Sequence, residues 1–137
     1  MIYADNAATT RMSDTAIETM TALMKECYGN PSSLYGTGQK AKEILEQARE
    51  EVAALIGASA RDIYFTSGGS EADNQAIRSA AEIGRRKGKM HIISSAFEHH
   101  AVLHTLNRLE KEGFEITLLP VHENGLVVPA ELEQAIR

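Results

Sequence analysis

The chain has 137 residues, and 14 Lys and Arg residues against 19 Asp and Glu residues give it a formal charge of −5. Hydrophobic residues make up 43% and charged residues 24%, which is typical of a globular protein and too apolar for a disordered chain. The acidic balance argues against nucleic acid as a partner, and the single cysteine excludes a disulfide scaffold and favours a reducing, cytoplasmic location.

The N-terminal half predicts two helices joined by loops of small residues. Residues 2–5 are compatible with a short strand or an extended arm and lack the basic and apolar regions of a signal peptide. Ser13 or Asp14 begins a helix, and the turn at residues 29–31 ends it. A second, longer helix follows the loop at residues 31–38 and stops at Gly57. No stretch is apolar for long enough to span a bilayer, so we expect no membrane contact.

The C-terminal half alternates between strand and helix patterns. Strands are predicted at residues 62–66, 90–94 and 114–119, and helices at residues 71–87 and 99–112, with a last helix that begins near Pro129. This alternation indicates βαβ units with right-handed crossovers, and therefore an α/β fold with a parallel sheet. Three strands are few for an open sheet covered on both faces, so we expect the chain to be part of a larger protein.

The sharpest local pattern is the turn at residues 66–71, between a predicted strand and a predicted helix. Gly68 and Gly69 let backbone N–H groups turn toward an anion, and the start of the helix adds unpaired donors. Ser67 and Ser70 contribute hydroxyls. The pattern is neither a P-loop nor a dinucleotide-binding fingerprint. From the residues alone, a phosphate site and a plain capped turn both remain open.

His99 follows the next predicted strand and opens a predicted helix. Ligands of open α/β sheets lie at the carboxyl ends of the strands, so we expect His99 to face the same crevice as the turn at residues 67–70. An imidazole there can stack on a flat ligand or transfer a proton. The alternative is that His99 and His100 are solvated residues in the first turn of a helix.

His100 and His104 lie four residues apart and share a helix face, a spacing that is compatible with zinc ligands. The pattern lacks the glutamate of the HExxH zinc motif, and the single cysteine, Cys27, lies far away in the sequence. We therefore predict no metal ligands in this chain.

Several short motifs occur in order along the chain: YADNAATT at residues 3–10, GNPSS at 29–33, FTSGGSEADN at 65–74, EHHAV at 98–102, EGFEI at 112–116 and NG at 124–125. Together they resemble the cysteine desulfurases of the NifS/IscS type, in the class V aminotransferase group of fold-type I pyridoxal-phosphate enzymes. The resemblance covers essentially the whole chain and matches the N-terminal third of those enzymes.

The resemblance implies a three-layer α/β/α fold with a mainly parallel sheet. Residues 1–12 would form an N-terminal arm that packs with the small domain, and residues 13–137 the first part of the large domain. The implied cofactor is pyridoxal 5′-phosphate. Its phosphate would be held by the backbone of Gly68 and Gly69 and by the Ser70 hydroxyl. His99 would stack on its ring and serve as the catalytic residue of this segment.

The implied activity is conversion of L-cysteine to L-alanine, with the sulfur passed on as a persulfide to an acceptor protein such as an iron–sulfur scaffold. The resemblance also implies a cytoplasmic homodimer. The family's Schiff-base lysine, pyridinium-partner aspartate and persulfide cysteine lie beyond residue 137, so the chain by itself is expected to be inactive. One position departs from the motif NPSSLH, because Tyr35 replaces its histidine.

Two other functions remain open at this point. Another enzyme of the same group, such as a selenocysteine lyase or an aminotransferase, would share these motifs. A cofactor-free α/β module that binds a partner through an exposed sheet edge would share the fold.

Overall fold

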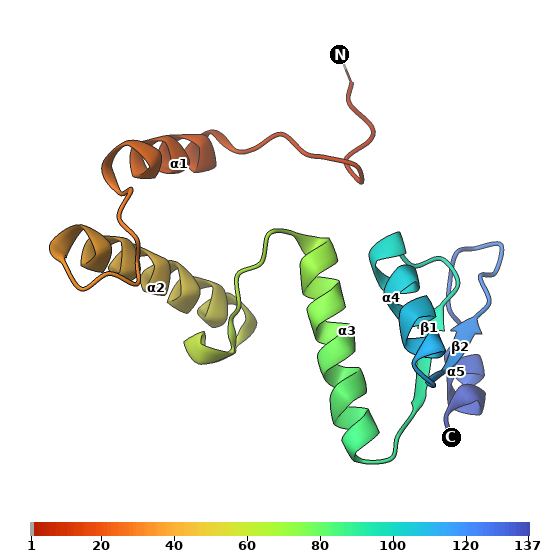
Figure 1. The fold of residues 1–137 in the computed structure, drawn as a ribbon. Coiled ribbons are helices and arrows are strands. Elements are labelled where there is room, and N and C mark those ends of the chain that lie inside the picture. Colours follow the sequence, from red (N-terminus) through yellow and green to blue (C-terminus); the bar gives the residue numbers. More distant parts are fainter. Residues whose placement is uncertain (1) are drawn as a thin grey trace. The chain divides into compact units, whose positions relative to one another are not determined.

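The computed structural model describes residues 2–137, which divide into two compact units, one that ends at Tyr64 and one that spans Phe65–Arg137. Figure 1 traces the elements along the chain. Among the described residues, no helix has the length and apolar character needed to cross a bilayer.

The first unit contains the two predicted helices, α1 (Asp14–Glu26) and α2 (Gly36–Ile56), followed by the 3-10 turn η1 (Ala60–Asp62). Ser13 caps α1 because its hydroxyl accepts the Ala16 N–H at 3.2 Å. Gly57 ends α2 with a φ of 67°, the left-handed conformation that glycine adopts without strain. Both predicted helices are confirmed, although α2 begins inside the segment assigned to the preceding loop.

The loop between α1 and α2 is closed by two glycines at which backbone meets backbone. A Cβ atom on Gly29 would lie 2.2 Å from the carbonyl oxygen of Thr37, and one on Gly38 would lie 2.6 Å from that of Asn30. The amides of Gly38 and Gln39 both donate to the Tyr35 carbonyl at 3.0 Å. Only residues without a side chain fit at these two crossings, which is why the loop follows this path.

The predicted strand at residues 62–66 is wrong. Its first residue closes η1, and residues 63–66 form no ladder with another segment of the described chain. The β-forming side chains around Ile63 favour an extended backbone, but a strand also needs a neighbour to pair its N–H and C=O groups. Here the Ile63 carbonyl accepts a hydrogen bond from the Arg49 guanidinium of α2 instead.

The second unit is a βαβ arrangement preceded by a helix and followed by another. In order it contains α3 (Gly69–Arg86), β1 (His91–Ser95), α4 (His100–Lys111), β2 (Glu115–Leu119) and α5 (Pro129–Ala135). The two strands pair in parallel, with His91 opposite Glu115 and Ser95 opposite Leu119. The predicted α/β class with a parallel sheet is therefore confirmed, together with five of the elements predicted for this half.

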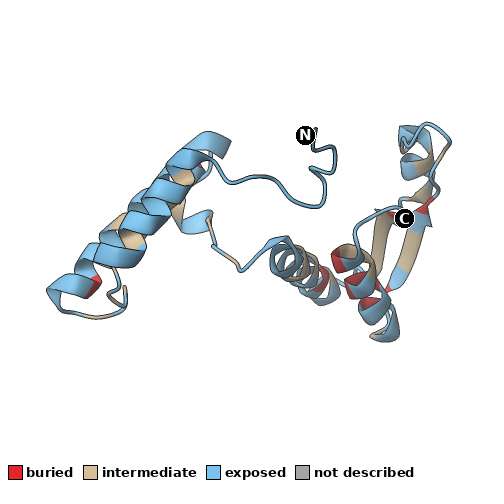
Figure 2. Ribbon diagram, turned by 90° about the horizontal axis from the view of Figure 1, so that it is seen from above, coloured by how far each residue is buried: buried red, intermediate tan, exposed pale blue. Residues whose placement is uncertain are grey.

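The core of the second unit lies where α3, α4 and β2 meet. Ala81, Leu109 and Phe114 form a buried cluster, and Leu106 is only 2% exposed. The Arg85 guanidinium lies 4.9 Å from the centroid of the Phe114 ring. Figure 2 shows the buried residues of this unit concentrated on α4 and at the strand ends. This packing fixes α3 against α4, and the first turns of these two helices carry the candidate site.

Candidate functional site

Glu71 closes the turn that precedes α3. One of its carboxylate oxygens accepts hydrogen bonds from the Ser67 hydroxyl at 2.6 Å and from the Ser67 N–H at 2.7 Å. These bonds, the hydroxyl first, hold the pKa of the Glu71 carboxyl below its ordinary value. The carboxylate therefore stays charged, and the Ser67 N–H is already engaged.

The residues after Ser67 form the start of α3, where backbone N–H groups lack helical partners. Gly68 is the N-cap of α3, and its carbonyl accepts the Ala72 N–H at 3.1 Å. The N–H groups of Gly69, Ser70 and Glu71 have no carbonyl partner one turn earlier in the helix. A Cβ atom on Gly68 or Gly69 would meet no heavy atom within 4 Å, so the space in front of this turn is open. These donors at the positive end of an 18-residue helix are suited to an anion.

His99 is the N-cap of α4. Its Nδ1 accepts the backbone N–H of Ala101 at 3.1 Å, so in the neutral ring the proton sits on Nε2. The loop that leads from β1 to His99 is held by Glu98, whose carboxylate accepts the hydroxyl of the buried Ser95 at 2.8 Å. The ring is exposed, and its Nε2 is left for a ligand.

Ser70 and His99 line one cavity of about 370 Å³ that extends along the first three turns of α3 and α4. Gly68 and Gly69 are not among the described residues that line it. Its other lining residues, which include two arginines and two further histidines, are Asn74, Arg78, His100, Ala101, His104, Thr105 and Arg108. The sequence predicted a crevice between neighbouring strands. The structure instead brings Ser70 and His99 together between two helix N-termini, because the segment before the turn is not a strand.

Two residues at this cavity were given no role from the sequence, Asn74 of α3 and Thr105 of α4. The Thr105 hydroxyl lies 2.6 Å from Asn74 Oδ1, which joins the two helices. The pair is separated by 31 residues, and no local motif or periodicity signals a bond over that distance.

The remaining histidines do not gather into a metal centre. His100 and His104 stack with ring centroids 5.4 Å apart, His91 bonds the Thr117 hydroxyl, and His122 pairs with Glu131. Within residues 2–137, no group of three His, Cys, Asp or Glu side chains is placed to hold a metal ion.

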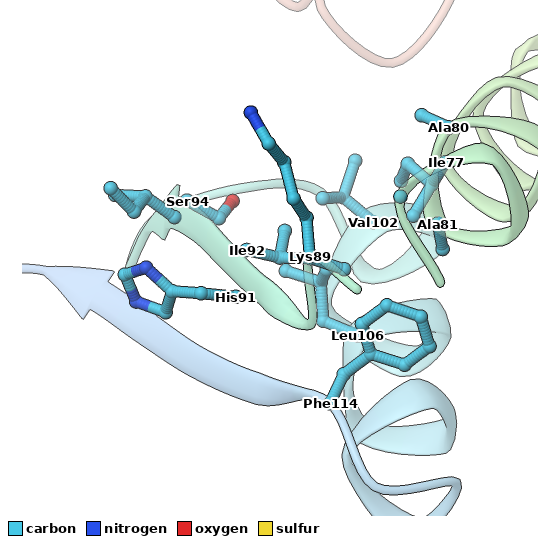
Figure 3. Close-up of a pocket in the computed structure, with 12 residues that line it drawn as sticks. Ile77, Ala80, Ala81, Lys89, His91, Ile92, Ser94, Val102, Leu106 and Phe114 are labelled. Carbon is cyan, nitrogen blue, oxygen red and sulfur yellow. The ribbon is translucent and has the colours of Figure 1, made fainter. Parts of the chain in front are cut away.

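A larger cavity of about 470 Å³ lies elsewhere in the second unit, between α3, α4 and β1. Figure 3 shows that Ile77 of α3, Val102 and Leu106 of α4 and Phe114, the residue before β2, point toward it. Its walls are mainly side chains of the core and its edge, and neither Ser70 nor His99 contributes to it. We therefore place the candidate site at the smaller, polar cavity.

Comparison with known proteins identifies the family to which the chain belongs. The sequence profile of the family described as Aminotransferase class-V matches residues 2–137, and the chain belongs to that family. Among individual proteins, it is similar to the cysteine desulfurase IscS of Methanosarcina thermophila, with 51% identity over 136 residues. That match covers 99% of this chain and 33% of the relative.

Two solved structures resemble the chain closely. A structure titled NifS-like protein superposes with a TM-score of 0.90 at 40% identity, over 96% of this chain and 36% of that one. A structure titled SspA in complex with cysteine gives a TM-score of 0.89 at 38% identity, over 98% and 39% of the two chains. The chain spans about a third of the length of the curated relatives it matches. The predicted resemblance to the cysteine desulfurases is confirmed.

Proposed function

We propose that this chain is the N-terminal part of a pyridoxal-phosphate-dependent cysteine desulfurase. The complete enzyme would convert L-cysteine to L-alanine and pass the sulfur as a persulfide to an acceptor protein, such as an iron–sulfur scaffold. The names of the relatives support this proposal. The observation that carries it is the meeting of Ser70 and His99 at one cavity, because an anion donor set and an imidazole there suit a flat, phosphorylated cofactor.

The residues present fit pyridoxal 5′-phosphate. The open N–H groups of Gly69 and Ser70, with the Ser70 hydroxyl, would bind the phosphate at the start of α3. Gly68 keeps the approach free of side-chain atoms. Arg78 lines the same cavity and adds positive charge, whereas Arg108, which also lines it, is paired with Glu112. The donors at the start of α3 would anchor the cofactor with His99 beside it.

His99 would stack on the cofactor ring and take part in proton transfer. Its Nδ1 accepts the Ala101 N–H, so in the neutral ring Nε2 carries the proton and would donate a hydrogen bond to a ligand. To accept a proton from the substrate at Nε2, the ring would have to release the Ala101 N–H and carry its own proton on Nδ1. The bound cofactor supplies an electron sink for the electrons released at the substrate Cα. The α4 cap fixes the ring orientation before any ligand arrives.

The other parts of the reaction belong to the rest of the proposed enzyme. The lysine that holds the cofactor, the aspartate at its ring nitrogen and the persulfide cysteine would follow this chain, which by itself would be inactive. We propose a cytoplasmic homodimer, a location in keeping with the single free cysteine.

The test uses the complete gene product. We expect the purified protein to be yellow and to release alanine and sulfide in equal amounts from L-cysteine in the presence of a thiol reductant. Residues 1–137 expressed alone are the control and should show no turnover. A colourless protein that takes up no pyridoxal 5′-phosphate would point to a binding module. Turnover of L-selenocysteine without turnover of L-cysteine would point to a selenocysteine lyase.

A further inference from the structure

We infer that Asn74 and Thr105 form a positioning element that sets the phosphate turn and His99 at a fixed separation. This inference rests on the proposed function, because it assigns the two residues a task in holding the cofactor. Neither residue needs to touch the cofactor. They act through the backbone of Ser70 and of Ala101.

The bonds of Asn74 reach both sides of the candidate site. Its Nδ2 donates to the Ser70 carbonyl at 2.8 Å and lies 3.4 Å from the Ala101 carbonyl. Ala101 in turn donates its N–H to His99 Nδ1. A single side chain therefore links the residue that ends the phosphate turn to the residue that orients the imidazole.

Thr105 fixes the Asn74 amide in this orientation. Its hydroxyl lies 2.6 Å from Asn74 Oδ1 and 2.8 Å from the Ala101 carbonyl. A hydroxyl has one hydrogen to donate, and the amide oxygen can only accept, so the shorter contact requires Thr105 to donate to Asn74. The Asn74 NH₂ group is then directed at the two carbonyls. Reversing the amide would place its oxygen against the Ser70 and Ala101 carbonyl oxygens, neither of which can donate a hydrogen bond.

The pair lies in a setting where a lost bond is costly. Thr105 is 3% exposed, and both residues line the cavity between α3 and α4. Water has little access to Thr105, and in Thr105→Val the Asn74 amide oxygen loses the hydroxyl that donates to it, whereas without Asn74 the Thr105 hydroxyl still has the Ala101 carbonyl as an acceptor. The core cluster holds the bodies of the two helices together, whereas Asn74 acts within one turn of both N-termini.

The separation of the two first turns matters because the cofactor must satisfy both at once. Its phosphate would lie on the turn before α3 and its ring against His99. If the first turns of α3 and α4 shift relative to each other, the cofactor can keep its phosphate contact or its contact with His99, but not both. Pyridoxal, which lacks the phosphate, is free of this constraint.

The experiment measures how strongly the complete apo-protein binds pyridoxal 5′-phosphate and pyridoxal. For Asn74→Ala and for Thr105→Val, we expect the affinity for pyridoxal 5′-phosphate to fall about tenfold, the loss typical of one buried hydrogen bond, and that for pyridoxal to change less than about twofold. Thr105→Ser keeps the hydroxyl and should recover wild-type binding. Asn107→Ala, on an exposed position of α4, is the matched control and should bind both ligands as the wild type does.

Three results would overturn the inference. The first is an unchanged preference for the phosphorylated ligand in both variants, even with a lowered unfolding midpoint, because that is what a merely structural pair produces. The second is a Thr105→Ser variant as weak as Thr105→Val. The third is full additivity in the Asn74→Ala/Thr105→Val double variant, since residues that act as one unit are not additive. If Asn74→Ala does not fold, the two Thr105 variants still decide. A wild-type protein that binds both ligands equally would instead refute the proposed function.

Discussion

His99 has two tasks in the structure, and two substitutions separate them. It caps α4 through Nδ1, and it would present its ring to the cofactor. His99→Ala removes both. His99→Asn removes the ring but keeps a side chain that ranks among the best N-caps.

The two tasks differ in size and in what they affect. Losing an N-cap costs about 1 kcal/mol of stability, within a range of about 0.5–2 kcal/mol. Losing a group that transfers protons costs about 10²–10⁴ in rate. His99→Ala should therefore lose both the stability and the rate, whereas His99→Asn should recover most of the stability and none of the rate. A change in the visible spectrum of the bound cofactor should accompany both variants.

The assays are denaturant unfolding and turnover of L-cysteine by the complete enzyme. His100→Ala is the control, because it removes a neighbouring imidazole that makes no cap bond, and it should stay close to wild type in both assays. Wild-type turnover by His99→Asn would refute the role of the His99 ring in proton transfer. An equal, small loss of rate in His99→Ala and His100→Ala would refute it as well.

Ser70→Ala should weaken cofactor binding by about 1–3 kcal/mol, measured by equilibrium dialysis of the apo-protein, and unchanged affinity would remove the hydroxyl from the site. Because the pKa of Glu71 is lowered, its carboxylate stabilises the fold at pH values above its ordinary pKa of 4.5, and this contribution is lost as the pH falls through the lowered pKa. The stability difference between wild type and Glu71→Gln should therefore shrink on acidification in urea unfolding, and a difference that is constant with pH would contradict this role. Replacing both His100 and His104 by Ala should leave metal content and activity unchanged, whereas stoichiometric zinc that this double variant loses would establish a metal site.

Local signals in the sequence were enough for the helices. Ser13 supplies an oxygen where the first N–H groups of α1 need one, and Gly57 adopts the left-handed conformation that ends α2. Neither depends on distant residues. The strand prediction at residues 62–66 was wrong for the opposite reason. A strand depends on a neighbouring strand to pair with, and the described chain supplies none for this segment.

Some features of the candidate site likewise follow from local sequence patterns, whereas others depend on tertiary packing. The open turn at Gly68 and Gly69 and the position of His99 at a helix start follow from short patterns, and the structure has both. The capping bond of His99 and the bridge between Asn74 and Thr105 do not follow, since they depend on side-chain orientation and on how α3 packs against α4. The cofactor roles of these residues remain predictions.

The close backbone contacts at Gly29, in the loop after α1, and at Gly38, in the first turn of α2, have a consequence for how this region can change in evolution. These contacts determine the path of the chain, and the Tyr35 carbonyl accepts the N–H groups of Gly38 and Gln39. The Tyr35 side chain makes no capping bond, and the residue is 64% exposed. Replacing the Tyr35 side chain therefore leaves these backbone contacts in place, whereas a side chain on either glycine would force the backbone to shift.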